Sequence, residues 1–206
     1  MKQIKFIIFI LLIIFQISVP CYMLINLNFK LNNPNNKIIR LECEPRDPYD
    51  FMRGRYVTLN FKIDRINFTT MESLKDVTGD DFEKKYKKSI IYCILEEKNS
   101  FYIIKDMTFK KPDKNTLFIK SKFSYYDYYD KSITLLFDFN KYYMQEEYAK
   151  KAEEILRFNS NFETLNPTLV LVVDDDGNAY QKSLEVMGKS IEKYIDEELQ
   201  KNKTKN

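Results

Sequence analysis

The sequence contains no histidine, which narrows the chemistry open to this protein. Histidine is the commonest general base and metal ligand in proteins, so Ser-His-Asp triads, Cys-His pairs and histidine-bound zinc are excluded. Glycine is scarce too, with 4 among 206 residues, and none of them lies in a glycine-rich phosphate loop. Nucleotide binding through a P-loop or a dinucleotide fingerprint is therefore excluded. We expect a protein without cofactor or metal that is not an enzyme.

A large excess of charge of one sign is also missing. The 33 Lys and Arg residues nearly balance the 30 Asp and Glu residues, and the formal net charge is +3. Lys2 and Lys5 supply two of these charges, so the remaining chain has no basic footprint for nucleic acid. The length and the 44% hydrophobic content are those of a single folded domain of ~100–200 residues.

What the chain does have is a long apolar run at its N-terminus. The 20 residues from Phe6 to Ile25 carry no charge, and a helix of that length is ~30 Å long, the thickness of a bilayer core. Lys2 and Lys5 precede this run, which predicts a cytoplasmic N-terminus by the positive-inside rule. We therefore expect a retained signal-anchor that crosses the cell membrane once, with everything after it extracytoplasmic.

Two other interpretations of the run stay open. It would serve as the apolar part of a cleaved signal peptide, although Pro20 stands where cleavage needs a small residue. Lipidation of Cys21 meets the same obstacle. The expected organisation is a cytoplasmic tip and anchor in residues 1–27, an extracytoplasmic domain in residues 28–187, and a charged helical tail in residues 188–206.

After the anchor, the hydrophobic pattern is mainly that of strands. Alternation and β-branched or aromatic residues predict strands at 37–44, 56–64, 89–95, 100–109, 116–123, 132–139, 168–174 and 179–186. Helical spacing appears late, in residues 143–158. This pattern predicts a mainly β (α+β) domain, a sandwich or partly closed barrel with one late helix. Cys43 and Cys93 fall in predicted strands, either as one disulfide or as two buried thiols.

The densest group of unusual residues is the loop and strand at 44–61, which reads EPRDPYDFMRGRYVTLNF. Pro48 restricts the loop, Gly54 permits a close approach, and Arg53 is placed to pair with Asp47 or Asp50. Tyr56 has a ring to bury and a hydroxyl to satisfy. Ordered loops of this kind either support the fold or bind a partner, and both interpretations stay open.

This segment resembles the signature of the GDYXXLXY family of bacterial membrane-anchored proteins. The matching positions are Asp47-Pro48, Arg53-Gly54, Tyr56, Val57 and Leu59. Two positions depart from the family, with Arg55 in place of its Asp and Phe61 in place of its final Tyr. The likeness continues in the segment Tyr142-Tyr143-Met144-Gln145-Glu146 and in the acidic stretch Val172–Ala179.

The resemblance implies a single-pass protein with an extracytoplasmic domain, often encoded beside a multi-spanning membrane protein. It brings no catalytic residues and no assigned biochemical role. We expect a non-catalytic accessory or interaction subunit of an envelope membrane complex. The residues expected to form its partner contact or its structural motif are Asp47, Pro48, Arg53, Gly54, Tyr56, Leu59, Tyr143 and Glu146.

The alternative is an envelope hydrolase or a glycan-binding module. Its carboxylates would come from Asp47, Asp50, Glu146 and Glu147, and its sugar platform from the tyrosine run at 125–130. The stretch 174–178, DDDGN, invites a calcium site, but glycine falls at the fourth rather than the sixth position of an EF-hand loop. A hairpin turn at Asp176-Gly177 is the simpler interpretation.

Overall fold

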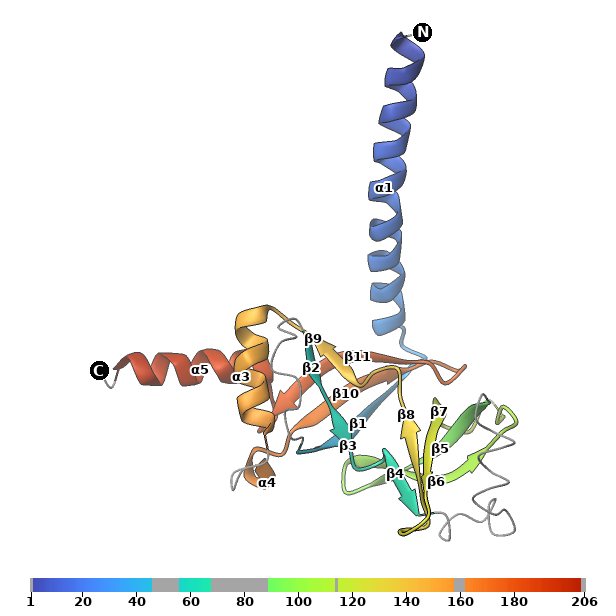
Figure 1. Cartoon of the computed structure of the whole chain (residues 1–206), viewed down its shortest axis with the longest axis vertical. Coiled ribbons are helices and arrows are strands. Elements are labelled where there is room, and N and C mark those ends of the chain that lie inside the picture. The colour runs from blue at the N-terminus through green and yellow to red at the C-terminus, as the bar shows by residue number, and fades with distance from the viewer. Residues whose placement is uncertain (1, 46–55, 68–88, 114, 158–161, 205–206) are drawn as a thin grey trace. The chain divides into compact units, whose positions relative to one another are not determined.

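The structure, a computed structural model of the whole chain, describes residues 2–45, 56–67, 89–113, 115–157 and 162–204 (Figure 1). The chain divides into two compact units, Met1–Asn36 and Lys37–Asn206. Most of the predicted loop, residues 46–55, lies outside the described residues.

The first unit contains one long helix, α1 (Lys2–Leu31). The most apolar stretch of its segment Gln3–Leu31 has a mean hydropathy of 2.5, and none of that stretch is buried within the protein. Pro20 lies inside this helix, a position tolerated in apolar membrane helices. Among the described residues, α1 is the one helix long and apolar enough to cross a membrane, as an anchor or as a signal sequence.

Within the described residues, the second unit is built from two five-stranded sheets and a two-stranded ribbon, all antiparallel (Figure 1). The first sheet has the order β12-β11-β10-β1-β3, with bounds Lys189–Ser190, Ala179–Val186, Thr168–Val173, Lys37–Glu44 and Asn60–Phe61. The second has the order β4-β8-β7-β5-β6, with bounds Arg65–Asn67, Ser132–Leu136, Phe118–Asp127, Ile90–Lys98 and Phe101–Thr108. The ribbon pairs β2 (Tyr56–Thr58) with β9 (Lys141–Tyr143). The helices are α3 (Glu146–Leu156), α4 (Phe162–Leu165) and α5 (Ile191–Thr204).

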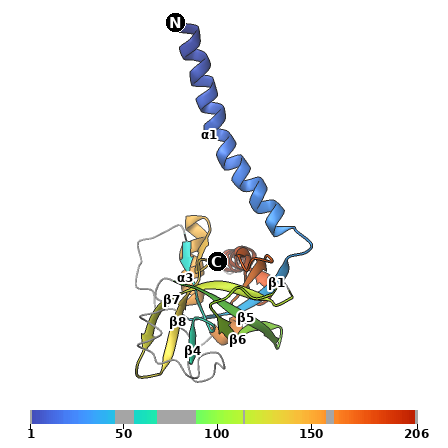
Figure 2. The same ribbon diagram turned by 90° about the vertical axis from the view of Figure 1, so that its right-hand side faces the viewer.

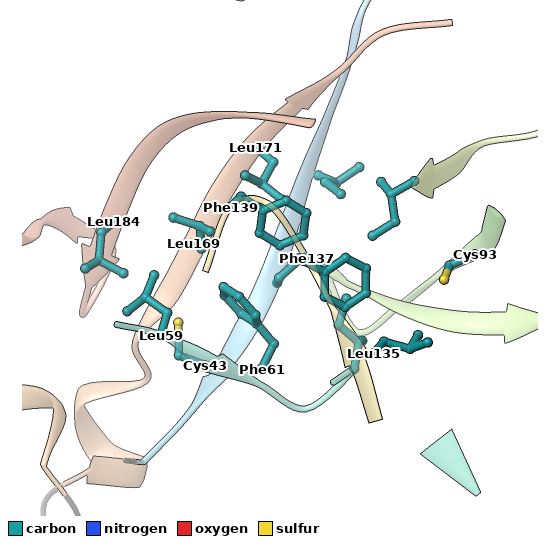
Figure 3. Close-up of a cluster of buried hydrophobic side chains, with 14 of the residues drawn as sticks. Cys43, Leu59, Phe61, Cys93, Leu135, Phe137, Phe139, Leu169, Leu171 and Leu184 are labelled. Atoms are coloured by element: carbon teal, nitrogen blue, oxygen red, sulfur yellow. The ribbon is translucent and has the colours of Figure 1, made fainter. Parts of the chain in front are cut away.

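One hydrophobic core joins the two sheets (Figure 3). Leu169 and Leu171 of the first sheet and Leu135 of the second belong to the same buried cluster. Phe139 lies among them, with its ring stacked on Phe137 at 5.0 Å and edge-on to Phe61 at 5.4 Å. Because the sheets share this core without closing on themselves, the expected mainly β domain is confirmed as two packed sheets and not as a closed barrel.

The apolar side chains of the predicted strand at 56–64 face the core as expected, but the segment is not one continuous strand. Val57, Leu59, Phe61 and Ile63 are all buried, as the alternation predicted. The segment nevertheless divides at Leu59, because β2 pairs with β9 whereas β3 pairs with β1. Alternation therefore predicted which side chains face the core and left the pairing partners unspecified.

The C-terminal segment belongs to the same compact unit as the sheets. Ile191 and Ile195 of α5 are buried in the common core, and the helix packs against α3 and β11. The compact unit that contains the sheets therefore includes α5.

Both cysteines of the domain are free thiols buried in the core (Figure 3). Cys93 lies on the second sheet with its Sγ 3.2 Å from Oγ of Ser121, and Cys43 lies on β1 of the first sheet. Burial raises the pKa of each thiol to about 12. Of the two possibilities that the sequence left open, the structure has the buried thiols.

Candidate contact surface

Two segments with family likeness, 87 residues apart in the chain, pair in the β2–β9 ribbon (Figure 1). Tyr56 lies opposite Tyr143, and Thr58 lies opposite Lys141. The two tyrosine rings are in contact, with centroids 5.5 Å apart, and Nζ of Lys141 lies 5.0 Å from the centroid of the Tyr56 ring. We call these four residues the aromatic ribbon; they present two rings and one cation on a single face.

Hydrogen bonds hold strand β9 to the rest of the domain, on the face that lies opposite the aromatic ribbon. Tyr142, between Lys141 and Tyr143, faces inward, and its hydroxyl donates to Oε1 of Glu192 on α5 at 3.2 Å. Burial, followed by the nearby Glu192, raises the pKa of Tyr142 to about 12, so this hydroxyl stays protonated as a donor. Nε2 of Gln181 on β11 donates to the carbonyl oxygen of Lys141 at 2.9 Å. These bonds fix β9, and so orient the exposed side chains of the ribbon.

The two tyrosines of the aromatic ribbon differ in how far they are exposed. Tyr143 is 68% exposed although its ring is packed on Tyr56, which is itself half-buried. A large ring that is both oriented and exposed is a typical anchor for a protein partner, since it loses little conformational freedom on binding.

The other predicted residues have different surroundings. Leu59 is 3% exposed and packs in the core, so it serves the fold and not a contact. Glu146 begins α3, which packs beside β2, and its carboxylate pairs with Lys150 at 3.7 Å. Asp47, Pro48, Arg53 and Gly54 lie outside the described residues.

The carboxylates of the alternative function are not gathered into a site by the described residues. Glu146 and Glu147 both lie in the first turn of α3, where negative charge is favoured by the helix dipole. Asp47 and Asp50 are outside the described residues.

The acidic stretch 174–178 forms a hairpin turn, as predicted. The carboxylate of Asp174 accepts hydrogen bonds from the backbone N–H groups of Asp176 at 3.0 Å and Asn178 at 2.9 Å, and from the hydroxyl of Tyr180 at 3.1 Å. Hydrogen-bond donors within or beside the turn thus use the oxygens of this carboxylate. Within the part of the chain that the structure describes, no three Cys, Asp or Glu side chains are placed to hold a metal ion.

Periodicity did not predict the strand that contains Lys141 and the inward-facing Tyr142, although family likeness had singled out Tyr142. Residues 132–139 predicted one strand and 143–158 one helix, so β9, which overlaps the start of that predicted helix at Tyr143, was missed. Burial alternates along Lys141, Tyr142 and Tyr143, but the sequence does not, because two tyrosines stand side by side in a strand of three residues.

The fold and the ribbon together define a class: a mainly β domain that follows a single apolar helix and presents an aromatic face. The chain belongs to the GDYXXLXY family, whose model, described as GDYXXLXY protein, matches residues 27–184. No curated protein and no solved structure matches the chain.

Proposed function

We propose that this protein is a membrane-anchored, non-catalytic interaction subunit of an envelope complex, and that the aromatic ribbon contacts a multi-spanning membrane protein. The observation that supports this most is the pairing of Tyr56 with Tyr143 across distant segments, with Tyr143 left 68% exposed. Tyrosine and other aromatic residues dominate the binding energy of protein interfaces when packing orients them.

Membrane attachment rests on α1. Its length and apolar composition are sufficient for one crossing, and Lys2 and Lys5 at its start favour an N-terminus in the cytoplasm. The domain from Lys37 onward would then be extracytoplasmic. A protease added to intact cells whose outer barrier has been opened should digest this domain, whereas a cytoplasmic domain would survive.

The partner contact is tested by affinity purification of the tagged full chain from native membranes in mild detergent, with quantitative mass spectrometry. We expect a multi-spanning protein to be recovered in near-equal amount with the wild type and about tenfold less with Tyr143→Ala, the loss that ~1.4 kcal/mol of binding energy represents. Tyr129→Ala is the matched control, because Tyr129 is 99% exposed and lies outside the ribbon. If folded Tyr143→Ala recovers as much of the partner as the wild type does, or if only Tyr129→Ala loses the partner, the aromatic ribbon is not the contact.

A further inference from the structure

A second candidate site lies on the second sheet, where β4, β8 and β7 run side by side (Figure 2). The register places Arg65 opposite Thr134 and Asn67 opposite Ser132, while the residues between them point into the core. Tyr125 of β7 also lies opposite Thr134. Polar side chains from three strands therefore share the face of the sheet that is turned away from the core.

A cavity of about 620 Å³ lies over this face. The turn between β3 and β4 forms another of its walls and contributes Lys62 and Asp64. Oδ2 of Asp64 accepts the backbone N–H of Phe61 at 2.7 Å, and its backbone carbonyl accepts the N–H of Leu135 at 2.8 Å. The cavity is of the size that small-molecule sites commonly have, ~300–1,000 Å³. Backbone hydrogen bonds hold Asp64 in place at its wall.

The serine in this cavity has an unusual environment. Ser132 is 3% exposed, and among the described residues its Oγ has no hydrogen-bond partner. Buried hydroxyls nearly always have a partner, because an unmade hydrogen bond is costly away from water. Ser132 lines the cavity, and a rotation about its Cα–Cβ bond would turn this buried hydroxyl toward a molecule bound there.

The charges around the cavity indicate what kind of molecule fits. Lys62 is paired with Glu42, and Arg65 lies 3.7 Å from Asp130, so both cations already have a counter-charge. Burial, followed by the nearby charge of Glu44, raises the pKa of Asp64 to about 7, although the N–H of Phe61 acts to lower it. A pKa near 7 lets this carboxyl donate a hydrogen bond in its protonated form and accept hydrogen bonds in either form. The carboxyl groups of Asp64 and Glu44, with amide and hydroxyl groups and no spare positive charge, suit a ligand that donates hydrogen bonds, such as a neutral molecule with many hydroxyls, and not an anion.

The aromatic side chain at the cavity completes this set. Tyr125 is 45% exposed, and its hydroxyl interacts with Thr134 and Arg65, both of which lower its pKa. Part of its surface is therefore open at the cavity. We propose that this cavity binds a neutral sugar, with Asp64 and Ser132 holding sugar hydroxyls and the ring of Tyr125 packing on an apolar face of the sugar.

The test is calorimetric titration of the full chain, purified in a polyoxyethylene ether detergent because alkyl glycosides would compete. The probes are glucose, galactose, mannose, N-acetylglucosamine, maltose and cellobiose, with inorganic phosphate and glycine as charged comparators. We expect at least one sugar to bind saturably at millimolar concentration, and Ser132→Ala to weaken that binding about tenfold.

Two variants keep the outcome interpretable. Ser121→Ala makes the same change at a buried serine of the same sheet whose Oγ lies against Cys93, so sugar affinity should be unchanged. Asp64→Asn retains an oxygen to accept the N–H of Phe61, and it should weaken sugar binding without unfolding the domain. The proposal is overturned if no sugar in the panel binds, if binding is equal in Ser132→Ala, or if phosphate or glycine binds in place of a sugar.

Discussion

Replacing Gly177 with alanine should destabilise the domain far more than the same change at Gly188. Both glycines have a left-handed backbone, with φ of +76° and +74°, where a side chain costs about 1–2 kcal/mol. At Gly188 no atom lies within 4 Å of an added Cβ. At Gly177 that Cβ would lie 2.5 Å from Cδ2 of Phe118, so one of the two must move.

Neither the turn nor the ring can move without a further loss of stability. Phe118 is 3% exposed, and the carbonyl oxygen of Gly177 accepts the backbone N–H of Lys120 at 3.0 Å, which ties the β10–β11 turn to β7. Displacing a packed core ring costs about 1–3 kcal/mol. The destabilisation is therefore about 2–5 kcal/mol for Gly177→Ala against about 1–2 kcal/mol for Gly188→Ala.

The assay is thermal and urea unfolding of the full chain in detergent, followed by the near-ultraviolet circular dichroism of its tyrosines. This signal reports the domain, because 14 of the 15 tyrosines lie after residue 36. A difference of ~2 kcal/mol corresponds to a melting temperature ~4–8 °C lower for Gly177→Ala than for Gly188→Ala. Equal destabilisation by the two substitutions would refute the contact between the turn and β7.

Two further predictions follow from buried titratable groups. The pKa of Asp64 is about 7 in the folded domain against 3.8 in the unfolded chain, so its contribution to stability is present at pH 4 and lost as pH rises to 7. The loss is at most about 4 kcal/mol, and urea midpoints for Asp64→Asn should depend less on pH over this range than those of the wild type. Because burial raises the pKa of Cys43 and Cys93, maleimide should label neither thiol in the folded domain and both in urea; rapid labelling of either before unfolding would contradict their burial.

The sequence predicted the faces of the strands better than their partners. The buried set from Val57 to Ile63 follows from alternation alone, and the β10–β11 hairpin follows from Asp176-Gly177 between two apolar runs. The break at Leu59 and the ribbon of β2 with β9 depend on contacts between distant segments, which no local pattern encodes. Strand β4, with three residues of which only Ile66 is buried, was missed because it carries almost no periodic signal.

For the candidate sites too, the sequence predicted individual residues better than their spatial partners. Tyr56 and Tyr143 were expected from family likeness, whereas their pairing was visible only in the fold. Neither the burial of Asp64 nor that of Ser132 could be predicted, because each depends on neighbouring strands that cover a short polar segment. Polar residues on short strands look like loop residues in sequence, and only the register shows that they share a face.

Site-specific photo-crosslinking in native membranes would show whether the aromatic ribbon contacts a membrane partner. Benzoylphenylalanine would replace Tyr143 in one variant and Tyr129 in another, since both side chains are exposed but only Tyr143 belongs to the ribbon. We expect a light-dependent adduct with a multi-spanning membrane protein from position 143 and none from position 129. An adduct from position 129 alone, or none from either position, would contradict it.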